Sequence, residues 1–180
     1  MDDIAKELGM SKKTIYQFFK EKDDLVNQLC ELELNEHECE FDQFNKAASD
    51  PIEEIIMISN KMRSMMQNIN PNFFMDLQKF YPAAFKRFQS FKENCAYSNV
   101  LSNLKKGMEA GIYRSDLDAE FVARYRMAQI DLLMFGTAFS FERVSFAKTH
   151  DLMLDMFMYA ISTVKGHKLI NNYKKIKEEE

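Results

Sequence analysis

The spacing of apolar residues along the chain predicts a series of helices. Near the N-terminus, Ile4, Ala5 and Leu8 recur at intervals of one and three to four residues, which places them on one face of a short helix. Gly9 suits the positive φ of a tight turn, and Ser11 is a residue type that caps the start of a helix. The first two predicted helices are therefore short and are joined by a tight turn.

Longer helices are predicted for the rest of the chain. A polar-flanked helix is expected from residue 21 to about residue 44, with an inward face made of Leu25, Leu29, Leu32 and Cys39 or Phe41. Capping residues and prolines delimit further helices over about residues 51–68, 72–80, 82–110, 119–147 and 149–164, with Gly166 as the final cap. No stretch alternates long enough between apolar and polar residues to require a strand. The fold class that follows is all-α.

Composition agrees with a folded helical protein. The chain has 180 residues, of which 46% are hydrophobic, so it can bury a substantial core. Five glycines and three prolines are few, which favours long helices over many short strands. No apolar run reaches the roughly 18–20 residues that a membrane-spanning helix needs. Acidic residues follow Met1 directly, where a secretory signal would carry a basic and then an apolar stretch.

The cysteines indicate a reducing compartment. Cys30, Cys39 and Cys95 are odd in number and lack a C-x-x-C spacing, which disfavours a disulfide framework. Together with the absence of a membrane or export signal from the sequence, this favours a cytoplasmic protein with no membrane partner.

Positive charge is concentrated near the second predicted helix. The chain as a whole has a formal net charge of -4, so no global field attracts nucleic acid. Residues 11–22 nevertheless hold four lysines against one acid, which leaves three positive charges in excess. Phosphate contacts need charge only at the docking face, so this segment is a candidate for binding DNA.

Residues 2–25 resemble the second half of the DNA-binding domain of the TetR family. The matching pieces are Asp-Ile-Ala, Leu-Gly-Met-Ser and Thr-Ile-Tyr, followed by Phe19, Lys22 and Leu25 at the family's spacing. Residues 107–118 are weakly similar to the loop that precedes the family's dimerisation helices.

The resemblance implies a helix-turn-helix DNA-binding segment at residues 1–25 and a TetR-type helical ligand-binding and dimerisation domain at residues 26–180. The family places a complete helix before this motif, so we expect the natural protein to begin upstream of Met1. Phe18 stands where family members often carry a polar or basic side chain, so one phosphate contact is expected to be missing.

A recognition helix lays its N-terminal residues in the major groove of double-stranded DNA, where base edges and phosphates are within reach. The residues expected to contact DNA are Ser11, Lys12, Lys13, Thr14, Tyr16 and Lys22. The function implied is a ligand-responsive transcriptional regulator, a repressor that a small effector releases from its operator.

The effector is expected to be apolar, because the chain holds 16 Phe and 13 Met but no Trp. Residues that are candidates for lining its pocket are Met62, Met66, Phe74, Phe88, Phe91 and Tyr97. For each of them, ordinary core packing is the alternative.

The resemblance also implies a homodimer through the two C-terminal helices, residues 119–147 and 149–164. Phe121, Met134 and Met156 are among the apolar residues that such a bundle would bury. A two-fold dimer presents two recognition helices one turn of DNA apart, which predicts a near-palindromic operator.

Other classes of function receive less support. His37 and Cys39 lie two residues apart on a helix, so they point about 200° apart and do not share one ion. No Gly-rich phosphate loop and no nucleophile paired with a histidine is found. We therefore expect neither an enzyme nor a bound metal or cofactor. The alternative that remains is a dimeric ligand-binding or protein-interaction module that has lost DNA binding.

Overall fold

The computed structural model describes residues 1–66, 69–70, 72–136 and 145–176. Within these residues the regular structure is helical, apart from an isolated antiparallel bridge between Tyr113 and Ser162. The predicted all-α fold is confirmed.

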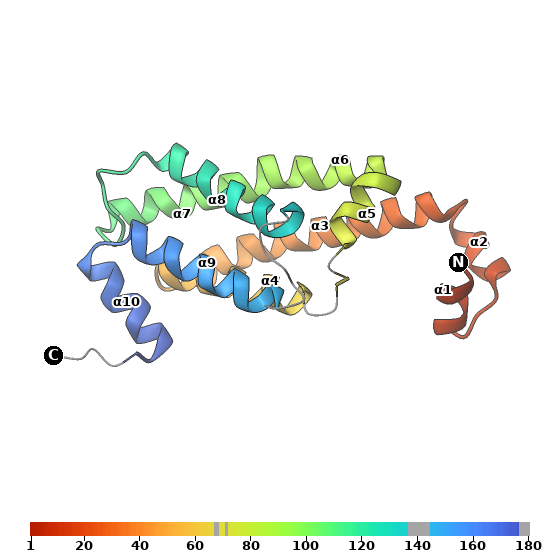
Figure 1. Cartoon of the computed structure of the whole chain (residues 1–180), viewed down its shortest axis with the longest axis horizontal. Coiled ribbons are helices and arrows are strands. Elements are labelled where there is room, and N and C mark those ends of the chain that lie inside the picture. The colour runs from red at the N-terminus through yellow and green to blue at the C-terminus, as the bar shows by residue number, and fades with distance from the viewer. Residues whose placement is uncertain (67–68, 71, 137–144, 177–180) are drawn as a thin grey trace.

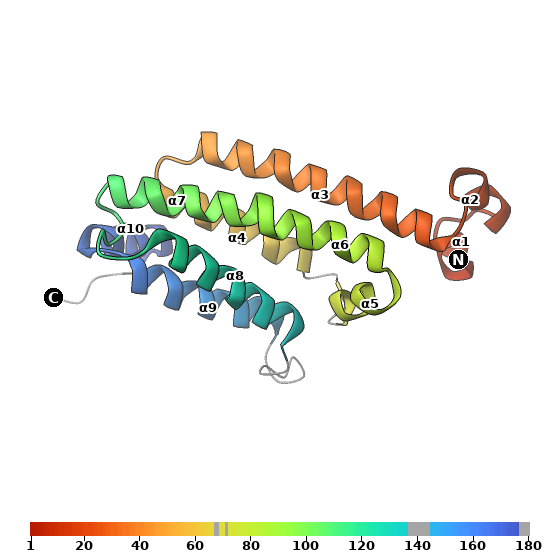
Figure 2. The ribbon, with the colours of Figure 1, turned by 90° about the horizontal axis from the view of Figure 1, so that it is seen from above.

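Ten α-helices and one π-helical turn are found in the described residues. In chain order they are α1 (Asp2–Glu7), α2 (Lys12–Phe18), α3 (Lys22–Ala47), α4 (Pro51–Met66), α5 (Phe73–Phe80), α6 (Pro82–Phe91), η1 (Lys92–Ala96), α7 (Tyr97–Glu109), α8 (Ala119–Phe135), α9 (Phe146–Ile161) and α10 (Val164–Lys174). Because α6, η1 and α7 follow one another without a break, they form one long rod (Figure 2).

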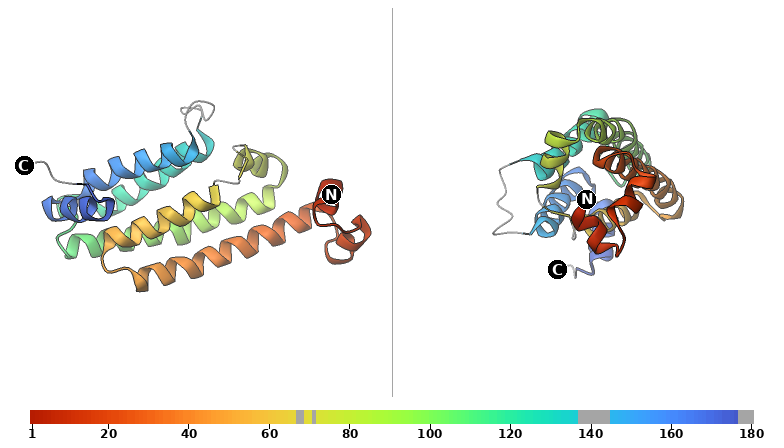
Figure 3. Two further views of the ribbon diagram at one scale, coloured as in Figure 1. Left: turned by 90° about the horizontal axis from the view of Figure 1, so that it is seen from below. Right: turned by 90° about the vertical axis from the view of Figure 1, so that its right-hand side faces the viewer.

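The molecule is elongated, with α1 and α2 at one end and α10 at the other (Figure 1). The long helix α3 leads from the N-terminal pair into the helical body, where it lies beside α6 (Figure 2). On the other side of the body α8 and α9 lie side by side, and α10 packs against α4 and α9 (Figure 3). The N-terminal pair therefore connects to the body mainly through α3.

The buried core lies between α4, α7, α8, α9 and α10. Apolar side chains from these five helices form one cluster, with Ile52, Leu104, Ala123, Phe157 and Ile170 among its members. A corner of the chain between α7 and α8 closes this core at the end that carries α10 (Figure 1).

A network of hydrogen bonds stabilises the chain segment between α7 and α8. The hydroxyl of the buried Tyr113 donates to Oδ1 of Asn103 at 3.0 Å. Nδ2 of Asn103 in turn donates to Oε2 of Glu54 and to the carbonyl of Pro51, both at 3.0 Å. Burial, reinforced by the charge of Glu54, raises the pKa of Tyr113, so its hydroxyl stays protonated and remains a donor.

Gly107 allows the Tyr113 ring to lie against α7. A Cβ at this position would fall 2.0–2.8 Å from three ring carbons of Tyr113. We expect Gly107→Ala to lower the free energy of unfolding by about 1–3 kcal/mol, because a packed core does not accommodate the added methyl group. Urea denaturation checks this, with Lys105→Ala on the exposed face of the same helix as the control. Equal midpoints for the two variants would show that Tyr113 moves aside freely.

Two predicted helix ends are wrong. α8 ends at Phe135, not near residue 147, because Gly136 adopts an extended backbone and glycine weakens a helix. The next helix then starts at Phe146, where Oγ of Ser145 accepts a hydrogen bond from the backbone N–H of Lys148. Part of the predicted range, residues 137–144, lies outside the described residues.

Gly166 is the third residue of α10 and not a helix cap, so that prediction is also wrong. Thr163 caps α10, since its Oγ1 accepts from the backbone N–H of Gly166 at 3.3 Å. A Cβ at Gly166 would lie 2.4 Å from the carbonyl oxygen of Ile112, so glycine permits the close approach of this helix to the corner.

The predicted inward face of α3 is wrong in part. Leu25 and Phe41 are half-buried, but Leu29 and Leu32 are exposed, and His37 is buried on a different stripe of the helix. The sequence offers two apolar stripes on this helix, and packing of α3 against α4 and α6 selects the one that holds Cys30 and Phe41.

Candidate nucleic-acid interface

The N-terminal helices α1 and α2 form a compact pair. Ala5 of α1 and Ile15 of α2 are their buried side chains. Gly9 between the helices has φ +63°, a conformation that glycine adopts without strain. The backbone N–H of Met10 donates to the carbonyl of Ala5 at 3.0 Å, which closes the turn. The predicted short helices and tight glycine turn are confirmed.

Ser11 and Thr14 stabilise the start of α2. Oγ of Ser11 accepts from the backbone N–H of Thr14 at 3.1 Å, and the two hydroxyl oxygens lie 2.8 Å apart. Both residues remain at the surface at the end of α2 that would enter a groove. The geometry gives Ser11 a structural role as the N-cap, and its contact with DNA stays a prediction.

We expect Ser11→Ala to destabilise α2 by about 1 kcal/mol, because an alanine removes the side-chain acceptor of the Thr14 N–H and leaves it only the Ser11 carbonyl, at 3.0 Å. Hydrogen exchange of the α2 amides measures this locally, and their protection should fall about fivefold. Gln17→Ala, an exposed change on the same helix, is the control. Unchanged protection in the Ser11 variant would contradict the capping role.

Two lysines occupy the first turn of α2. Lys12 forms an ion pair with Asp2 of α1, and the hydrogen bond from Lys12 lowers the pKa of that carboxyl group. Lys13 and Tyr16 are exposed, and so is Phe18 at the end of the helix. Lys13 and Tyr16 are therefore open to a ligand, while Lys12 must exchange Asp2 for a phosphate.

Lys22 lies apart from the first turn of α2, at the beginning of α3. Its Nζ is 5.6 Å from the centroid of the Tyr81 ring, and Tyr81 separates α5 from α6. A hydrogen bond with Tyr81 raises the pKa of Lys22. The residue thus links the N-terminal pair to the helical body, a position that sequence spacing did not indicate.

The candidate ligand residues fall into separate groups. The rings of Phe74 and Phe88 are 5.2 Å apart, and both contact Phe135 at 5.9–6.5 Å. Phe91 lies instead against Phe41 of α3, with a centroid distance of 5.9 Å.

Tyr97 lies under the guanidinium of Arg124, 5.2 Å from its ring centroid. Met62 and Met66 are half-buried on α4. Phe85 and Phe135 belong to the same aromatic cluster as Phe74 and Phe88.

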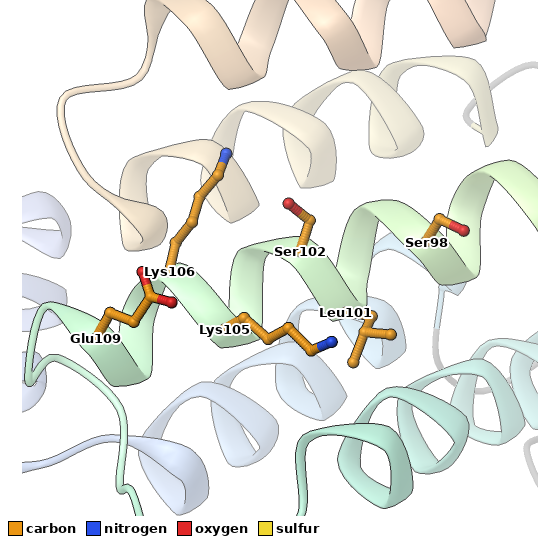
Figure 4. A pocket seen from close by; sticks show the side chains of 6 residues that line it. All are labelled: Ser98, Leu101, Ser102, Lys105, Lys106 and Glu109. Carbon is orange, nitrogen blue, oxygen red and sulfur yellow. The ribbon is translucent and has the colours of Figure 1, made fainter.

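A groove of about 380 Å³ runs along α7, and the side chains that line it are Ser98, Leu101, Ser102, Lys105, Lys106 and Glu109 (Figure 4). Lys106 extends towards α4, where its Nζ is 4.0 Å from Oε2 of Glu54, while Lys105 runs along the helix towards Leu101. All six side chains come from one helix, so the groove lacks the converging walls of a ligand site.

A second cavity, of about 240 Å³, lies between α4, α9 and α10. Its charged lining residues are Arg63, Asp151, Asp155 and Lys174. Three helices converge on it, so it fits a small ligand better than the groove along α7.

The histidine and cysteine of α3 lie apart. His37 is buried with its Nδ1 3.1 Å from Oε2 of Glu40, whereas Cys39 is exposed. Within the described part of the chain, no three His, Cys, Asp or Glu side chains are grouped closely enough to hold a metal ion. No helix in that part is both long and apolar enough to cross a membrane.

The chain resembles known regulators. Residues 1–29, which contain α1, α2 and the start of α3, match the family model described as bacterial regulatory proteins, tetR family. The N-terminal segment is thus similar to the DNA-binding segment of that family. The HTH-type transcriptional regulator YvaF of Bacillus subtilis (strain 168), itself uncharacterized, is 28% identical over 105 residues. That match covers 57% of this chain and 55% of YvaF, so the chain spans about half the length of the curated relative it matches.

Two solved structures share the TetR-type fold. The ketosteroid transcriptional regulator KstR2 of Mycobacterium tuberculosis aligns with a TM-score of 0.61 at 16% identity, over 89% of this chain and 83% of KstR2. A structure described as the molecular basis for control of antibiotic production by a bacterial hormone aligns with a TM-score of 0.60 at 17% identity. This alignment covers 89% of this chain and 85% of the chain in that structure. The predicted all-α fold, a helix-turn-helix segment followed by a larger helical domain, is confirmed.

Proposed function

We propose that the chain is a ligand-responsive transcriptional regulator that binds double-stranded DNA through α2. The observation that carries this proposal is the family match over residues 1–29, where Lys13 and Tyr16 are exposed on the helix that would enter the major groove. Ser11, Lys12 and Thr14 flank them on its first turn. Lys22 contacts Tyr81, so a movement of the helical body would change how Lys22 is placed against the bound DNA.

We propose that two copies pair through α8 and α9. Phe121 and Tyr125 are exposed four residues apart on α8, and Leu152 and Met156 have the same spacing on α9. Each pair therefore lies on one face of its helix, and α8 and α9 lie side by side. Joining this surface to its copy would bury apolar area that a single chain leaves in water.

Ligand control would act by population shift. An effector in the helical body would favour an arrangement in which the two recognition helices no longer match adjacent major grooves, and the DNA would be released. Packing of α3 against α6, together with the contact between Lys22 and Tyr81, offers a physical route between the body and α2. Repression relieved by the effector is the direction we propose.

Selection of duplexes from a random DNA library tests the proposal. We expect enrichment of a near-palindrome whose half-sites are about 10–10.5 base pairs apart, the spacing at which two recognition helices meet the same side of DNA. A chain with Lys13→Ala and Tyr16→Ala, which removes the two open side chains of α2, should enrich it much less. Absence of any enriched sequence with the unmodified chain would contradict DNA reading.

A second candidate function is a dimeric ligand-binding or protein-interaction module. It is favoured by apolar side chains on the surface of the N-terminal pair, since Leu8, Met10 and Phe18 are all exposed. The library selection separates the two candidates, because only a regulator enriches a DNA sequence.

A further inference from the structure

Arg126 of α8 is a buried charge that no carboxylate among the described residues pairs with. The side chain is 8% exposed, and its guanidinium carbon lies 5.3 Å from the centroid of the Phe157 ring. It donates one hydrogen bond, from Nη1 to Oε1 of Gln129 at 3.3 Å. None of the ion pairs within the described residues includes Arg126.

This guanidinium stays charged at neutral pH. Burial lowers the pKa of Arg126 only to about 10. Moving an arginine away from water is strongly unfavourable unless an anion and hydrogen bonds replace the lost hydration. Gln129 is neutral and fills one of the five donor positions of the side chain. Arg126 is therefore suited to an anion that the described residues do not supply.

A second unsatisfied group lies in the same interior. His150 of α9 is 2% exposed, with its Nδ1 3.4 Å from Oδ1 of Asp151, and its buried Nε2 has no hydrogen-bond partner. Burial and then the nearby charge of Arg126 lower the pKa of His150. Arg126 lies against Phe157, which is two turns from His150 on the same face of α9, so the guanidinium and the unsatisfied Nε2 lie along one side of that helix.

Arg63 of α4 adds a third donor beside this pair. Its Nη2 donates to Oδ1 of Asn60 at 3.0 Å and its Nη1 is 3.4 Å from Oδ2 of Asp151, but its buried Nε has no partner. Asp151 is shared between Arg63 and His150. Asp151 is therefore already engaged by Arg63 and His150, and none of the ion pairs in the described residues neutralises Arg126.

The surroundings define the rest of the ligand. Phe157, Met127 and Leu154 are buried apolar side chains of α8 and α9. Arg63, Asp151 and Leu154 also line the cavity of about 240 Å³ between α4, α9 and α10, whereas Arg126 and His150 lie behind this lining. A molecule that satisfied the cluster would carry a negative group on an apolar body.

We propose that the effector is a carboxylic acid with an apolar body, whose carboxylate pairs with Arg126 and lies beside Nε2 of His150. This inference rests on the proposed function, because it names the chemical class of the ligand that controls the regulator. It replaces a purely apolar effector by an amphipathic anion.

The test compares acids with their neutral amides. Calorimetric titration of the full chain with octanoate and benzoate, and with octanamide and benzamide, should show the acids binding at least about tenfold more tightly. The acids should also raise the melting temperature of the chain. Equal binding of acid and amide, or binding of neither acid, overturns the proposal.

Variants at position 126 identify the residue. Arg126→Met should abolish the preference for the acids, whereas Arg124→Gln, an exposed change two residues away, should leave it intact. Without ligand, Arg126→Met should melt at the same or a higher temperature, because removing an uncompensated buried charge is not destabilising. A large fall in the melting temperature would show that a carboxylate of the chain or of a second copy already pairs with Arg126, and would overturn the proposal.

DNA binding separates this proposal from the proposed function. The ligand-free Arg126→Met chain should bind the selected duplex as the unmodified chain does. If the chain reads DNA but does not distinguish acids from amides, only the effector proposal fails. If it prefers the acids but enriches no DNA sequence, the effector class stands and the regulator function fails.

Discussion

A chain carrying both Phe121→Glu and Met156→Glu is expected to be monomeric at micromolar concentration. In the single chain these side chains are 69% and 74% exposed, so the substitutions cost the folded monomer little. In the proposed dimer each would be buried against the partner, where an unpaired carboxylate costs several kcal/mol, roughly 2–5. Four such groups in one two-fold interface should abolish pairing.

Light scattering checks this result. The variant should give the mass of one chain, 21.2 kDa, while the unmodified chain should give twice that value. Leu29→Glu with Leu32→Glu is the matched control, because these residues of α3 are also exposed and apolar but lie away from α8 and α9. A dimer in the first variant, or a monomer in the control, would contradict the proposed interface.

Loss of the two lysines at the start of α2 is expected to weaken DNA binding about a hundredfold or more. Lys12 and Lys13 from two chains give a dimer four such lysines. Each phosphate contact that a lysine makes releases about one counterion. The slope of log affinity against log salt concentration should therefore become shallower by about four units in Lys12→Ala with Lys13→Ala. The loss should affect specific and random duplexes alike.

Fluorescence anisotropy at several salt concentrations measures both quantities. The control is Lys105→Ala with Lys148→Ala, which removes the same charge from exposed sites on α7 and α9. Asp2→Asn, which removes the partner of Lys12, should strengthen binding instead. An equal loss in the control would show that net charge, and not the start of α2, determines affinity.

The N-terminal pair was predictable because its signals are local. Gly9 sets the turn and Ser11 caps α2 through contacts within four residues, so residue type alone indicates the geometry. The ion pair between Lys12 and Asp2 and the contact between Lys22 and Tyr81 depend on how helices meet in space. The sequence therefore indicated which residues form the segment but not which of them are already engaged.

Errors in the helical body have the same origin. Two apolar stripes on α3 are equally regular in sequence, and only packing against α6 makes Leu29 and Leu32 the exposed ones. In the sequence Gly166 looks like a residue that ends a helix. In the structure the close approach of the Ile112 carbonyl is the reason that glycine occupies this position. Arg126 and His150 are buried together only because α8 packs against α9, so neither stood out as a functional residue. The spacing of residues in the sequence does not show which helices pack against each other, so these features could not be predicted from it.

Binding to DNA from the upstream region of the chain's own gene tests the proposed function most directly. The 180-residue chain would be titrated against that duplex and against a random duplex of equal length, at low and at moderate salt. A regulator should prefer the upstream duplex by about a thousandfold or more, and the preference should persist as salt weakens both complexes. Equal affinity for the two duplexes at both salt concentrations would contradict a sequence-reading regulator.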